Sequence, residues 1–564
     1  MPSRKALKIP SPDPALQKKL SLELSVSPVL AQVLINRGIK TAAQAQEFLR
    51  ASLSDLRPPE DFSQIRRAAD LVRQAAREKS KVLICGDYDA DGVTALCLVK
   101  ETLAKAGLQA QHYLPHRVKD GYGLNQEAVR QAKAQGVRLV ITVDCGVSNC
   151  AEVEELRRSN IEVIVTDHHE PPLDNLPPAS ALLNPKVGSC GYKFRELAGV
   201  GVAFKLCQAV SRSLLAEELD IVSLGTIADV VPLLSENRAM VKEGLREMQR
   251  TRRPGLRALM QSAGIENKRL NSVFVSFIIA PRINASGRMD SAEASLQLLL
   301  VKEKAEAEEL VKLLESRNRQ RQQEEQRLLA EAEELINREV NFQEHKAIVV
   351  AGPGWHQGIL GVAASKLADK FWRPTVVISL AGDACRASGR SVGNFHLFHA
   401  LKECGHLLRA FGGHSHAAGL VIGREQIEEF RRQFNRVAAD RLSLEDLLPA
   451  LDVEMELPLA DLNDGLIAEL EQLEPFGCGN REPLFYTPGL KLKGEPQVLG
   501  RKTLKFWVTD GETCRQVIGF GMAELKEGLS AAAGFNLVYQ PRRDSWQGVE
   551  TLILEAKEVF FRQD

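Results

Sequence analysis

The chain has 564 residues, enough for two to four domains, and 44% of them are apolar, as in ordinary globular proteins. Lys plus Arg and Asp plus Glu both total 73, so any nucleic-acid binding must come from a local basic surface and not from the net charge. Ten cysteines without a Cys-x-x-Cys pair argue against zinc ribbons and disulfide scaffolds. No run of eighteen apolar residues occurs, so we expect a soluble cytoplasmic protein without a signal peptide or membrane span.

Residues 1–60 contain short amphipathic stretches, at 27–37 and 41–51, separated by prolines. We expect them to form an N-terminal cap on the main domain. Their residues indicate no chemistry of their own.

From about residue 62 to 235, apolar strands alternate with helical patterns. This alternation predicts a parallel sheet with helices on both faces, in which ligands bind beyond the carboxyl ends of the strands. The predicted strands are 82–85, a shorter one near 113, 139–143 and 161–165.

The segment 81–92, KVLICGDYDADG, ends its strand in three acids: Asp87, Asp89 and Asp91. In extended backbone, residues two apart point the same way, so we expect all three carboxylates to face one spot. Crowded carboxylates repel one another unless a cation relieves them, and hard oxygen ligands suit Mg²⁺ or Mn²⁺.

Further polar residues follow the other strands: Asp144 in VDCG, His168 and His169 in TDHHEP, and Asp229 in the later helical run IVSLGTIADVVPL. Each alone is typical of a helix N-cap or a turn residue. Taken together, Asp89, Asp91, Asp144, His168 and Asp229 predict a site for two cations that share a carboxylate, suited to phosphoryl displacement. His169 either orients a ligand, donates a proton or is structural.

Residues 236–290 are rich in arginine, which is equally typical of a solvated helix face. They end in PRINASGRMD, where we expect a turn carrying Asn284, Ser286, Gly287 and Arg288, groups that suit a phosphate. Residues 291–340 are charged and predict one long connecting helix.

A second, smaller α/β domain is expected over 341–447, after a first domain over 61–290. Two polar loops, ASGRS and FGGHSHAAG, offer an anion the side chains of Ser388 and Arg390 and the backbone of Gly412, Gly413 and His414.

Five short β-like runs within 448–564 predict a small barrel such as an OB-fold. Basic and aromatic residues alternate there, including Lys505, Trp507 and Trp546, as in single-strand binding surfaces. We assign Phe506 and Phe520 to the barrel core.

The ordered series GDYDADG, VDCG, TDHHEP, GTIADVVPL and GGHSHAAG resembles the DHH–DHHA1 phosphoesterases, and within them the RecJ family of single-strand-specific 5′→3′ DNA exonucleases. DGYGL, PRINASGRMD, GWHQGILGV, ASGRS and EPFGCGN also look like RecJ signatures, so the resemblance covers roughly residues 60–564. It implies hydrolysis of DNA to mononucleotides with two Mn²⁺ or Mg²⁺ ions, in recombination and repair. It also implies a monomer that works beside single-strand-binding protein and a RecQ-type helicase.

The resemblance also implies roles for individual residues. Metal ligands would be Asp89, Asp91, Asp144, His168 and Asp229, with Asp87 and His169 as supporting catalytic residues. DNA would be held by Arg117, Tyr122, Asn284, Ser286, Arg288, Ser388, Arg390, Gly412, Gly413 and His414, with Tyr122 stacking on a base. Cys85 stands where many smaller DHH enzymes have a histidine, so one metal site is expected to be weaker.

Two alternatives remain at this stage. A DHH phosphodiesterase of short oligonucleotides or cyclic dinucleotides would share the features of residues 81–420 but would lack the barrel. A catalytically dead binding or scaffold protein would keep the fold, although decayed sites usually lose their carboxylates.

Overall fold

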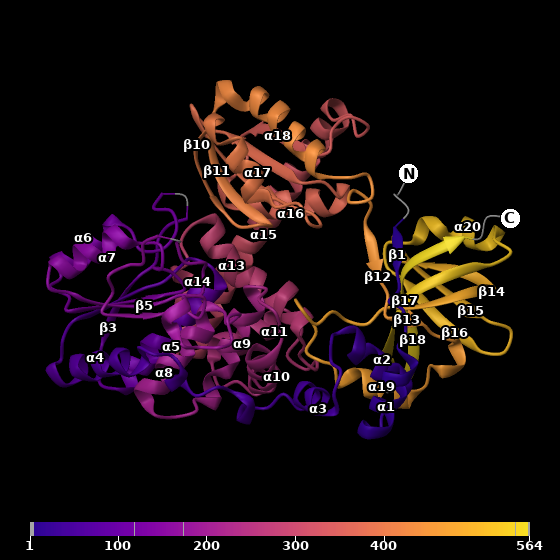
Figure 1. Ribbon diagram of the computed structural model, residues 1–564, viewed down its shortest axis with the longest axis horizontal. Coiled ribbons are helices and arrows are strands. Elements are labelled where there is room, and N and C mark those ends of the chain that lie inside the picture. The colour runs from indigo at the N-terminus through magenta and orange to yellow at the C-terminus, as the bar shows by residue number, and fades with distance from the viewer. Residues whose placement is uncertain (1–4, 118, 173, 547–548, 562–564) are drawn as a thin grey trace. The chain divides into compact units, whose positions relative to one another are not determined.

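The computed structural model describes residues 5–117, 119–172, 174–546 and 549–561, and leaves the side chains of residues 545, 546 and 549 undescribed. The chain forms two compact units (Figure 1). Unit 1 comprises Leu56–Val231 and Glu243–Pro449, and unit 2 comprises Lys5–Asp55, Pro232–Lys242 and Ala450–Asp564. No helix in the described ranges is long and apolar enough to cross a membrane.

The first sheet of unit 1 has five parallel strands in the order β3-β2-β4-β5-β6. Their bounds are β2 Val82–Cys85, β3 Ala110–Tyr113, β4 Leu139–Val143, β5 Glu162–Thr166 and β6 Ala181–Leu183. The chain leaves β2 toward β3 on one side and later returns to β4 on the other. Such a topological switch point, here between β2 and β4, is where open α/β sheets bind ligands.

Helices cover both faces of this sheet, as predicted. In Figure 1, α6 and α7 lie on one side of it and α4 and α8 on the other. The helices of this first domain are α4 Ile65–Glu78, α5 Ala90–Lys105, α6 Gln126–Ala134, α7 Cys150–Arg158, α8 Gly199–Ser211 and α9 Leu219–Ala228. The central strands β2 and β4 are buried on both faces, which explains their continuous apolar sequences.

The connection between the two α/β parts is helical but not a single helix. After α10 Ser235–Gln249, α11 Pro254–Ser262 and α12 Ser272–Phe274 come α13 Ala280–Met289, α14 Glu293–Leu300 and α15 Lys304–Glu339. The expected turn in PRINASGRMD is wrong, because these residues form α13. The expected single helix over 291–340 is also wrong, since it is interrupted between α14 and α15.

The second sheet of unit 1 is mixed, in the order β10-β11-β9-β8-β7. The strands are β7 Ile348–Pro353, β8 Thr375–Leu380, β9 Ala384–Arg390, β10 Leu408–Gly413 and β11 Ala417–Gly423, with α16 Leu360–Phe371, α17 Leu397–Glu403 and α18 Ile427–Arg441. The two segments that we expected to be polar loops are therefore strands, because ASGRS ends β9 and FGGHSHAAG forms the β10–β11 hairpin.

Unit 2 contains the predicted closed barrel, in which β14, β15, β16, β18 and β17 follow one another and β17 pairs back with β14. The strands are β14 Phe485–Leu499, β15 Thr503–Thr509, β16 Cys514–Gly519, β17 Phe535–Trp546 and β18 Val549–Phe561, and α20 Lys526–Ala531 lies between β16 and β17. Phe506 is buried in the core as expected, whereas Phe520 is 64% exposed, so its core assignment is wrong. The Trp546 side chain lies outside the described residues.

The N-terminal segment packs on the barrel, and not on the main domain as we expected. Its helices are α1 Pro14–Leu24, α2 Pro28–Asn36 and α3 Ala42–Arg50, and its strand β1 Ala6–Lys8 pairs with β12 Ala450–Asp452. Leu30 and Leu34 share one core with Leu457 and with barrel residues such as Phe485. The strand β13 Met455–Glu456 and the helix α19 Asp464–Glu471 complete this unit. The architecture confirms the predicted fold class: a parallel α/β domain, helical connection, smaller α/β domain and OB-type barrel.

Candidate active site and metal centre

The carboxyl ends of β2, β4 and β5 bring the predicted acids and histidines together. Asp87 follows β2, Asp144 follows β4, and His168 and His169 follow β5. Asp229 reaches the same place from the C-terminal end of α9. The switch point between β2 and β4 thus concentrates side chains from four separate segments of the chain.

The three acids of the first motif do not face one spot by strand alternation. Asp89 is the N-cap of α5, where its Oδ1 accepts hydrogen bonds from the backbone N–H groups of Asp91 and Gly92 at 3.0 and 3.1 Å. Asp91 already lies in the first helical turn. Its two oxygens accept hydrogen bonds from the N–H groups at the start of α8, Gly199 at 2.7 Å and Val200 at 2.8 Å. Helix formation after Asp89 therefore splits the acids into two groups.

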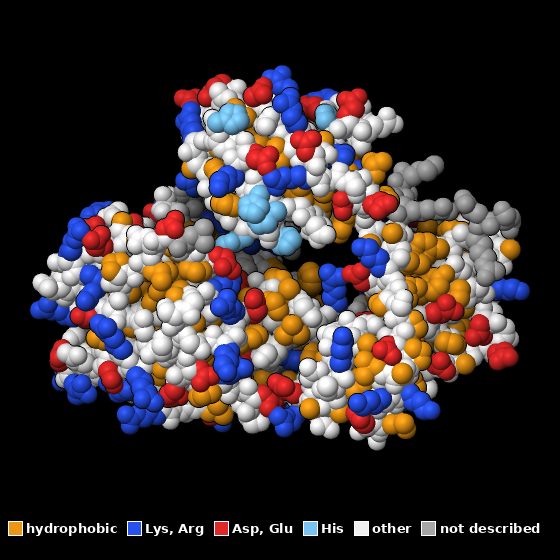
Figure 2. All heavy atoms as spheres, in the orientation of Figure 1, with side chains coloured by type: hydrophobic (Ala, Val, Ile, Leu, Met, Phe, Trp, Pro, Cys, Tyr) orange, Lys and Arg blue, Asp and Glu red, His pale blue; other side chains and the backbone are white. Residues whose placement is uncertain are grey.

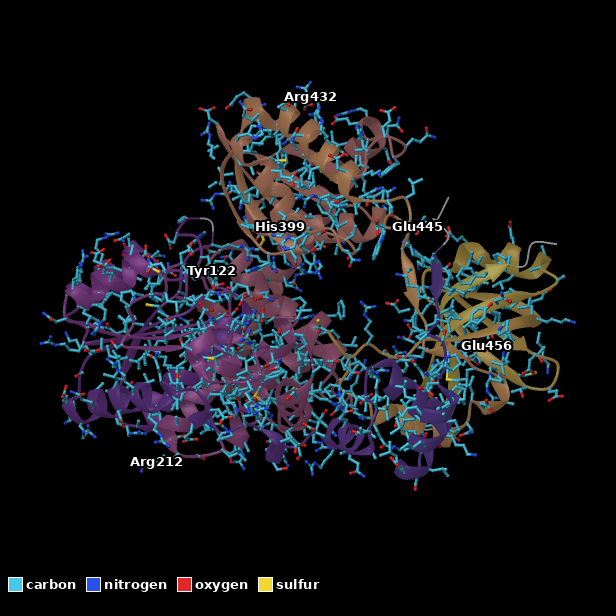
Figure 3. All side chains as sticks on the ribbon, viewed as in Figure 1. Tyr122, Arg212, His399, Arg432, Glu445 and Glu456 are labelled. Atoms are coloured by element: carbon cyan, nitrogen blue, oxygen red, sulfur yellow. The ribbon has the colours of Figure 1, made fainter. Side chains whose placement is uncertain are left out.

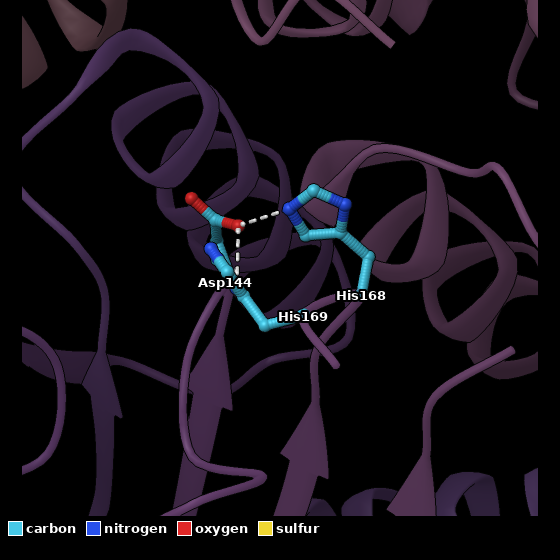
Figure 4. A group of neighbouring side chains, drawn as sticks. All are labelled: Asp144, His168 and His169. Carbon is cyan, nitrogen blue, oxygen red and sulfur yellow. Dashed lines mark ion pairs between the residues drawn. The ribbon is translucent and has the colours of Figure 1, made fainter. Parts of the chain in front are cut away.

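Asp144 occupies the centre of the site. Its backbone is left-handed, with φ of 59°, a conformation that non-glycine residues rarely adopt and that recurs at functional sites. Its Oδ1 lies 3.2 Å from Nε2 of His168 and 4.0 Å from Nδ1 of His169 (Figure 4). The same Nε2 lies 3.5 Å from Oδ2 of Asp229 and 4.0 Å from Oδ2 of Asp91.

Asp167, which we did not include in the predicted site, holds the histidine loop. Its Oδ1 accepts hydrogen bonds from the backbone of His168 and His169, and its Oδ2 accepts one from Val147, which follows Asp144 in the neighbouring loop. The same Oδ1 lies 2.8 Å from Nδ1 of His169. An ionised carboxylate only accepts, so this contact places a proton on Nδ1 of His169.

Tyr122 completes this arrangement. Its hydroxyl donates to the backbone oxygen of Asp144 at 2.7 Å and lies 2.9 Å from Nδ1 of His169. The ring is 42% exposed and lies among the loops at the upper edge of the parallel-sheet domain, where Figure 3 labels it. The exposed ring remains available to a ligand while its hydroxyl is fixed.

The carboxylates of the site oppose one another electrostatically. Burial, and then Asp91 and Asp89, raise the pKa of Asp144 well above its ordinary value. Burial and the same two neighbours also raise the pKa of Asp229, and burial with Asp89 raises that of Asp91 to about 7. Buried acids with raised pKa values are typical of functional sites that a cation completes.

The histidines respond in opposite ways. Burial lowers the pKa of His168 to about 3, so its ring is the neutral imidazole that a metal requires. Burial also disfavours the charged form of His169, but the hydrogen bond with Asp167 and the nearby carboxylates outweigh it and raise the pKa of His169.

The donor set fits divalent cations. Within the described residues, Oδ1 of Asp87, Oδ1 of Asp144 and Oδ2 of Asp229 are buried and accept no hydrogen bond. Three overlapping groups bring ligand atoms within 4.8 Å of one another, namely Asp144–His168–His169, Asp91–His168–Asp229 and Asp87–Asp89–Asp144. Carboxylate oxygens suit Mn²⁺ or Mg²⁺, and Asp144, whose carboxylate has two oxygens, belongs to two of the groups, as a ligand shared by two ions would.

Arginines from both α/β domains of unit 1 gather beside the acids. The guanidinium of Arg117 lies over the ring of Tyr88, 4.8 Å from its centroid. Burial, and then Arg117, lower the pKa of Arg288 to about 10, and Arg390 contributes further. The pKa of Arg390 is lowered by burial and by Arg117. Mutual repulsion of these cations favours a bound anion between them.

A cavity of ≈ 650 Å³ opens between the first domain and the sheet of the second. Tyr88, Arg117 and Tyr122 line one side, and Ser388, Gly412 and Gly419 belong to the other. A Cβ on Gly412 or Gly419 would meet no atom within 4 Å, so packing does not require glycine at either position. Their lack of a side chain leaves open space in the cavity. Arg390 lies directly behind it, since its Nη1 donates to the hydroxyl of Ser388 at 3.3 Å.

Some of the other predicted DNA contacts lie inside the fold, and others lie at the β10–β11 hairpin. Asn284 accepts a hydrogen bond from the backbone of Ala90 at 2.8 Å, and the buried Ser286 donates to the backbone of Ser291, so both brace the structure from within. Gly413 ends β10, where it pairs with Ala418, and His414 begins the turn to β11, with its N–H donating to the backbone oxygen of Ala417 at 2.8 Å. Histidine side chains gather on this face of the second domain (Figure 2).

Several lining residues were missed from the sequence: Tyr88, Gln357, Leu360, Arg386 and Phe411. Tyr88 lies inside the GDYDADG motif and Gln357 inside GWHQGILGV, so the motifs were the available signal. Arg386 and Phe411 lie in β9 and β10, where we expected loops. The sequence therefore provided no expectation of which side chains there point to which face of a sheet.

Family models match three parts of the chain: the DHH family N-terminal domain over residues 81–226, the DHHA1 domain over 344–440 and the RecJ OB domain over 453–558. The Bacillus subtilis protein named single-stranded-DNA-specific exonuclease RecJ is 36% identical over 560 residues, which is 99% of this chain and 71% of that protein. The chain belongs to the RecJ family.

Solved RecJ structures agree with this assignment. The crystal structure of RecJ in complex with Mn²⁺ from Thermus thermophilus has a TM-score of 0.86 and 30% identity, over 99% of this chain and 80% of the other. The Mg²⁺ complex of the same protein has a TM-score of 0.77 and 28% identity, over 99% and 79%. The predicted membership of the DHH–DHHA1 superfamily and of its RecJ branch is confirmed.

Proposed function

We infer that this RecJ-family chain is a metal-dependent exonuclease that degrades single-stranded DNA to mononucleotides from the 5′ end. One observation carries the proposal: unit 1 places buried carboxylate oxygens that accept no hydrogen bond beside a cavity bordered by arginines from two domains. Hydrolysis of a phosphodiester uses metal ions, which the acids would bind, and positive groups that stabilise the charged phosphate, which the arginines would supply. The RecJ relatives carry this activity in their names.

The metal-binding roles are proposed for Asp89, Asp91, Asp144, His168 and Asp229, with Asp87 in support. Asp144 belongs to two of the ligand groups and its carboxylate has two oxygens, so it would be the ligand that two ions share, whereas Nε2 of His168 would bind one ion. Bound Mn²⁺ or Mg²⁺ supplies an activated water at neutral pH and stabilises charge on the phosphate oxygens. Cys85 lies in β2 with its side chain buried, and the expected weakness of one metal site stays a prediction.

Residues of the chain itself handle orientation and protons. Asp167 accepts a hydrogen bond from Nδ1–H of His169, and the raised pKa of His169 favours the imidazolium, whose Nε2–H would donate to a phosphate oxygen or to the leaving group. Tyr122 holds the Asp144 backbone and the His169 ring at fixed distances while its exposed ring stacks on a base.

The 5′ end is held on the second domain. Ser388 and Arg390 would contact the terminal phosphate, with Arg117 and Arg288 completing the charge and the hairpin residues Gly412, Gly413 and His414 next to it. Single-strand selectivity would follow from a slot between the two α/β domains of unit 1 that is too narrow for a duplex and sized to stack one base at a time.

We further propose that the protein acts as a monomer in recombination and repair, beside single-strand-binding protein and a RecQ-type helicase, as the family resemblance implies. Analytical ultracentrifugation and pull-down with each purified partner would test these assignments separately from the chemistry.

The deciding experiment is digestion of 5′- and 3′-labelled single strands with and without Mn²⁺. We expect mononucleotide release from the 5′-labelled end first, only with metal, and slow digestion of a blunt duplex. Equal rates on both ends, or on duplex and single strand, would reject the proposal. Preference for a dinucleotide over a long strand would instead favour a phosphodiesterase of small substrates.

A further inference from the structure

A lysine follows the edge strand of the parallel sheet, and the function proposed above gives it no role. β6 pairs with β5 in parallel, so the carboxyl ends of both strands meet at the edge that carries the acids. Lys186 comes three residues after β6, and 22% of its side chain is exposed. It is therefore a cation at the same sheet edge as the candidate metal centre.

The backbone of Lys186 is fixed independently of its side chain. The amide nitrogen of the buried Asn184 donates to the backbone oxygen of His169 at 2.9 Å, and its oxygen accepts from the N–H of Lys186 at 2.8 Å. The N–H of Asp167 donates to the backbone oxygen of Leu183 at 3.0 Å. These bonds join the loop after β6 to the histidine loop, so the ammonium group is not needed to hold the two loops together.

The side chain of Lys186 has an exchangeable partner. Its Nζ lies 3.1 Å from Oε1 of Glu170, whose side chain is 60% exposed. Ion pairs with such exposed carboxylates contribute little to stability, because water and salt screen them. A lysine ammonium on its flexible stem can donate to a phosphate oxygen instead.

Electrostatic effects place the ammonium group near two predicted metal ligands and near the second domain. Burial and neighbouring acids raise the pKa of Asp229, and Lys186 is the cation that opposes them most. Burial and then His169 lower the pKa of His168 to about 3, and Lys186 contributes to this shift. Burial, His169 and then Lys186 lower the pKa of His414 on the β10–β11 hairpin. A phosphate beside Asp229 would therefore lie close to Lys186.

The arginines and the cavity lie on the other side of the acids. Arg117 lies over the ring of Tyr88, which follows β2, and both residues line the cavity. The cavity lining comes from the loops after β2 and β3 and from the second domain. In the sheet, β4 and β5 separate β2 from β6. The acid cluster therefore has cations at two opposite ends, the arginines near β2 and Lys186 after β6.

We propose that Lys186 binds the backbone phosphate that follows the scissile one on the 3′ side. This inference rests on the proposed nuclease function. A strand with its 5′ end in the cavity and its scissile phosphate at the acids reaches the β6 side with its next phosphate, where Lys186 exchanges Glu170 for a phosphate oxygen. Such a contact reads no sequence, and it holds the shortened strand after the terminal nucleotide has left.

The first test measures the affinity of a 5′-phosphorylated 20-nucleotide strand by fluorescence anisotropy without metal, so that hydrolysis plays no part. Lys186→Met should weaken binding about tenfold at low salt, through the loss of one charged hydrogen bond. The slope of log affinity against log salt concentration should fall in magnitude by about 0.7, the value for one phosphate of a single strand. Lys186→Arg keeps the charge and should retain the wild-type slope.

Lys133→Met is the matched control. Lys133 also forms an ion pair with a partly exposed glutamate, Glu155, but it lies at the C-terminal end of α6, near the amino ends of the strands. Its replacement removes the same charge from the opposite edge of the sheet, so affinity and salt slope should both stay as in the wild-type protein. An equal loss in this variant would show an effect of net charge alone and would overturn the proposal.

A neutral methylphosphonate linkage locates the contact. Moved one linkage at a time along the strand, it should weaken binding to the wild-type protein at the second linkage from the 5′ end, whereas Lys186→Met should lose no affinity there. Unchanged affinity and slope in folded Lys186→Met, or an equal response of both proteins to the second linkage, would overturn the inference. If the wild-type protein binds single strands but releases no nucleotide with Mn²⁺, the proposed function fails while the linkage scan still decides the Lys186 contact.

Discussion

At the scale of single residues, Asp144 combines strain, burial and a central position. Its left-handed backbone places the carboxylate against His168, and the start of α8 closes over it, since a Cβ on Gly199 would lie 2.4 Å from its Oδ1. The space around this carboxylate is therefore tightly limited. A substitution at this position is tolerated only if the new side chain has a similar volume and adopts a left-handed backbone.

We expect Asp144→Asn to lower the rate of DNA cleavage by at least about 100-fold, since loss of a residue that only supports a metal ligand already weakens metal affinity 10–100-fold. Asparagine tolerates left-handed backbone and keeps the volume, so it tests charge, whereas alanine would also strain the fold. Single-strand affinity, measured by anisotropy, should change less than twofold. A parallel loss of binding and cleavage would point to a folding defect.

The raised pKa values of the acids predict how metal binding depends on pH. The folded pKa of Asp91 is about 7, above its unfolded value, so the metal-free fold binds extra protons and loses stability as the pH rises from about 4 to 7. Mn²⁺ favours the ionised acids. The increase in Tm caused by Mn²⁺ should therefore be larger at pH 8 than at pH 6, with apparent affinity rising about tenfold per pH unit for each proton displaced.

Differential scanning fluorimetry at several Mn²⁺ concentrations measures this dependence. Asp144→Asn removes one titrating acid and should show a weaker pH dependence than the wild-type protein. A Tm increase that is the same at both pH values would mean that Mn²⁺ does not bind at these carboxylates.

At the scale of elements, the β10–β11 hairpin shows how a sheet face becomes a binding surface. Gly412 pairs with Gly419, and Gly419 pairs with Ser388 on β9, so three adjacent strands carry small residues in one row. The row borders the cavity, and alternation along each strand turns the neighbouring side chains to the other face. Small residues here leave space for the substrate.

We expect Gly412→Val to lower the affinity for single-stranded DNA by about tenfold or more while leaving Tm within about 2 °C of the wild type. Nothing lies within 4 Å of the added Cβ, and valine suits a strand, so the fold has room for it. The valine side chain would instead occupy space in the cavity that the substrate needs. Anisotropy and thermal unfolding on the same sample measure both effects, and the control is Gly188→Val, at an exposed glycine of unit 1 that does not line the cavity and where an added Cβ also meets nothing within 4 Å. Normal affinity in Gly412→Val would exclude Gly412 from the binding surface.

At the scale of the whole molecule, unit 2 is assembled from three separated segments, so it is not a simple C-terminal attachment. Val29, Leu30, Val33 and Leu34 of α2 are buried in the same core as the barrel. The fully buried Arg238 donates to the backbone oxygens of Phe48, Leu473 and Glu474, all within unit 2. The N-terminal helices and residues 232–242 therefore depend on the barrel for their burial.

We predict that a chain truncated after Pro449 aggregates, because the apolar side chains of α2 lose their partners, at about 2 kcal/mol for each fully buried side chain. A matched fragment of residues 56–449, without the N-terminal helices, should stay monodisperse longer. Size-exclusion chromatography and light scattering of the two fragments measure this. Equal behaviour would show that α1–α3 do not need the barrel.

The sequence by itself determined the order of the domains and the identities of the clustered acids. Strand periodicity and motif spacing are local, and a parallel sheet brings every strand's carboxyl end to one edge. That rule sufficed to place Asp87, Asp144 and His168 at one edge, whereas Asp229 joins them from the end of a helix.

Only the tertiary structure decided which groups those residues face. Asp91 is held by backbone N–H groups of α8, more than one hundred residues away, and Phe520 is exposed although Val517, three residues earlier, is a core residue. The N-terminal helices joined the barrel because their apolar faces match it, and no local pattern specifies which partner buries such a face. Burial and pairing over long sequence separations are properties of the assembled chain, so the surfaces available to DNA could not be derived from periodicity alone.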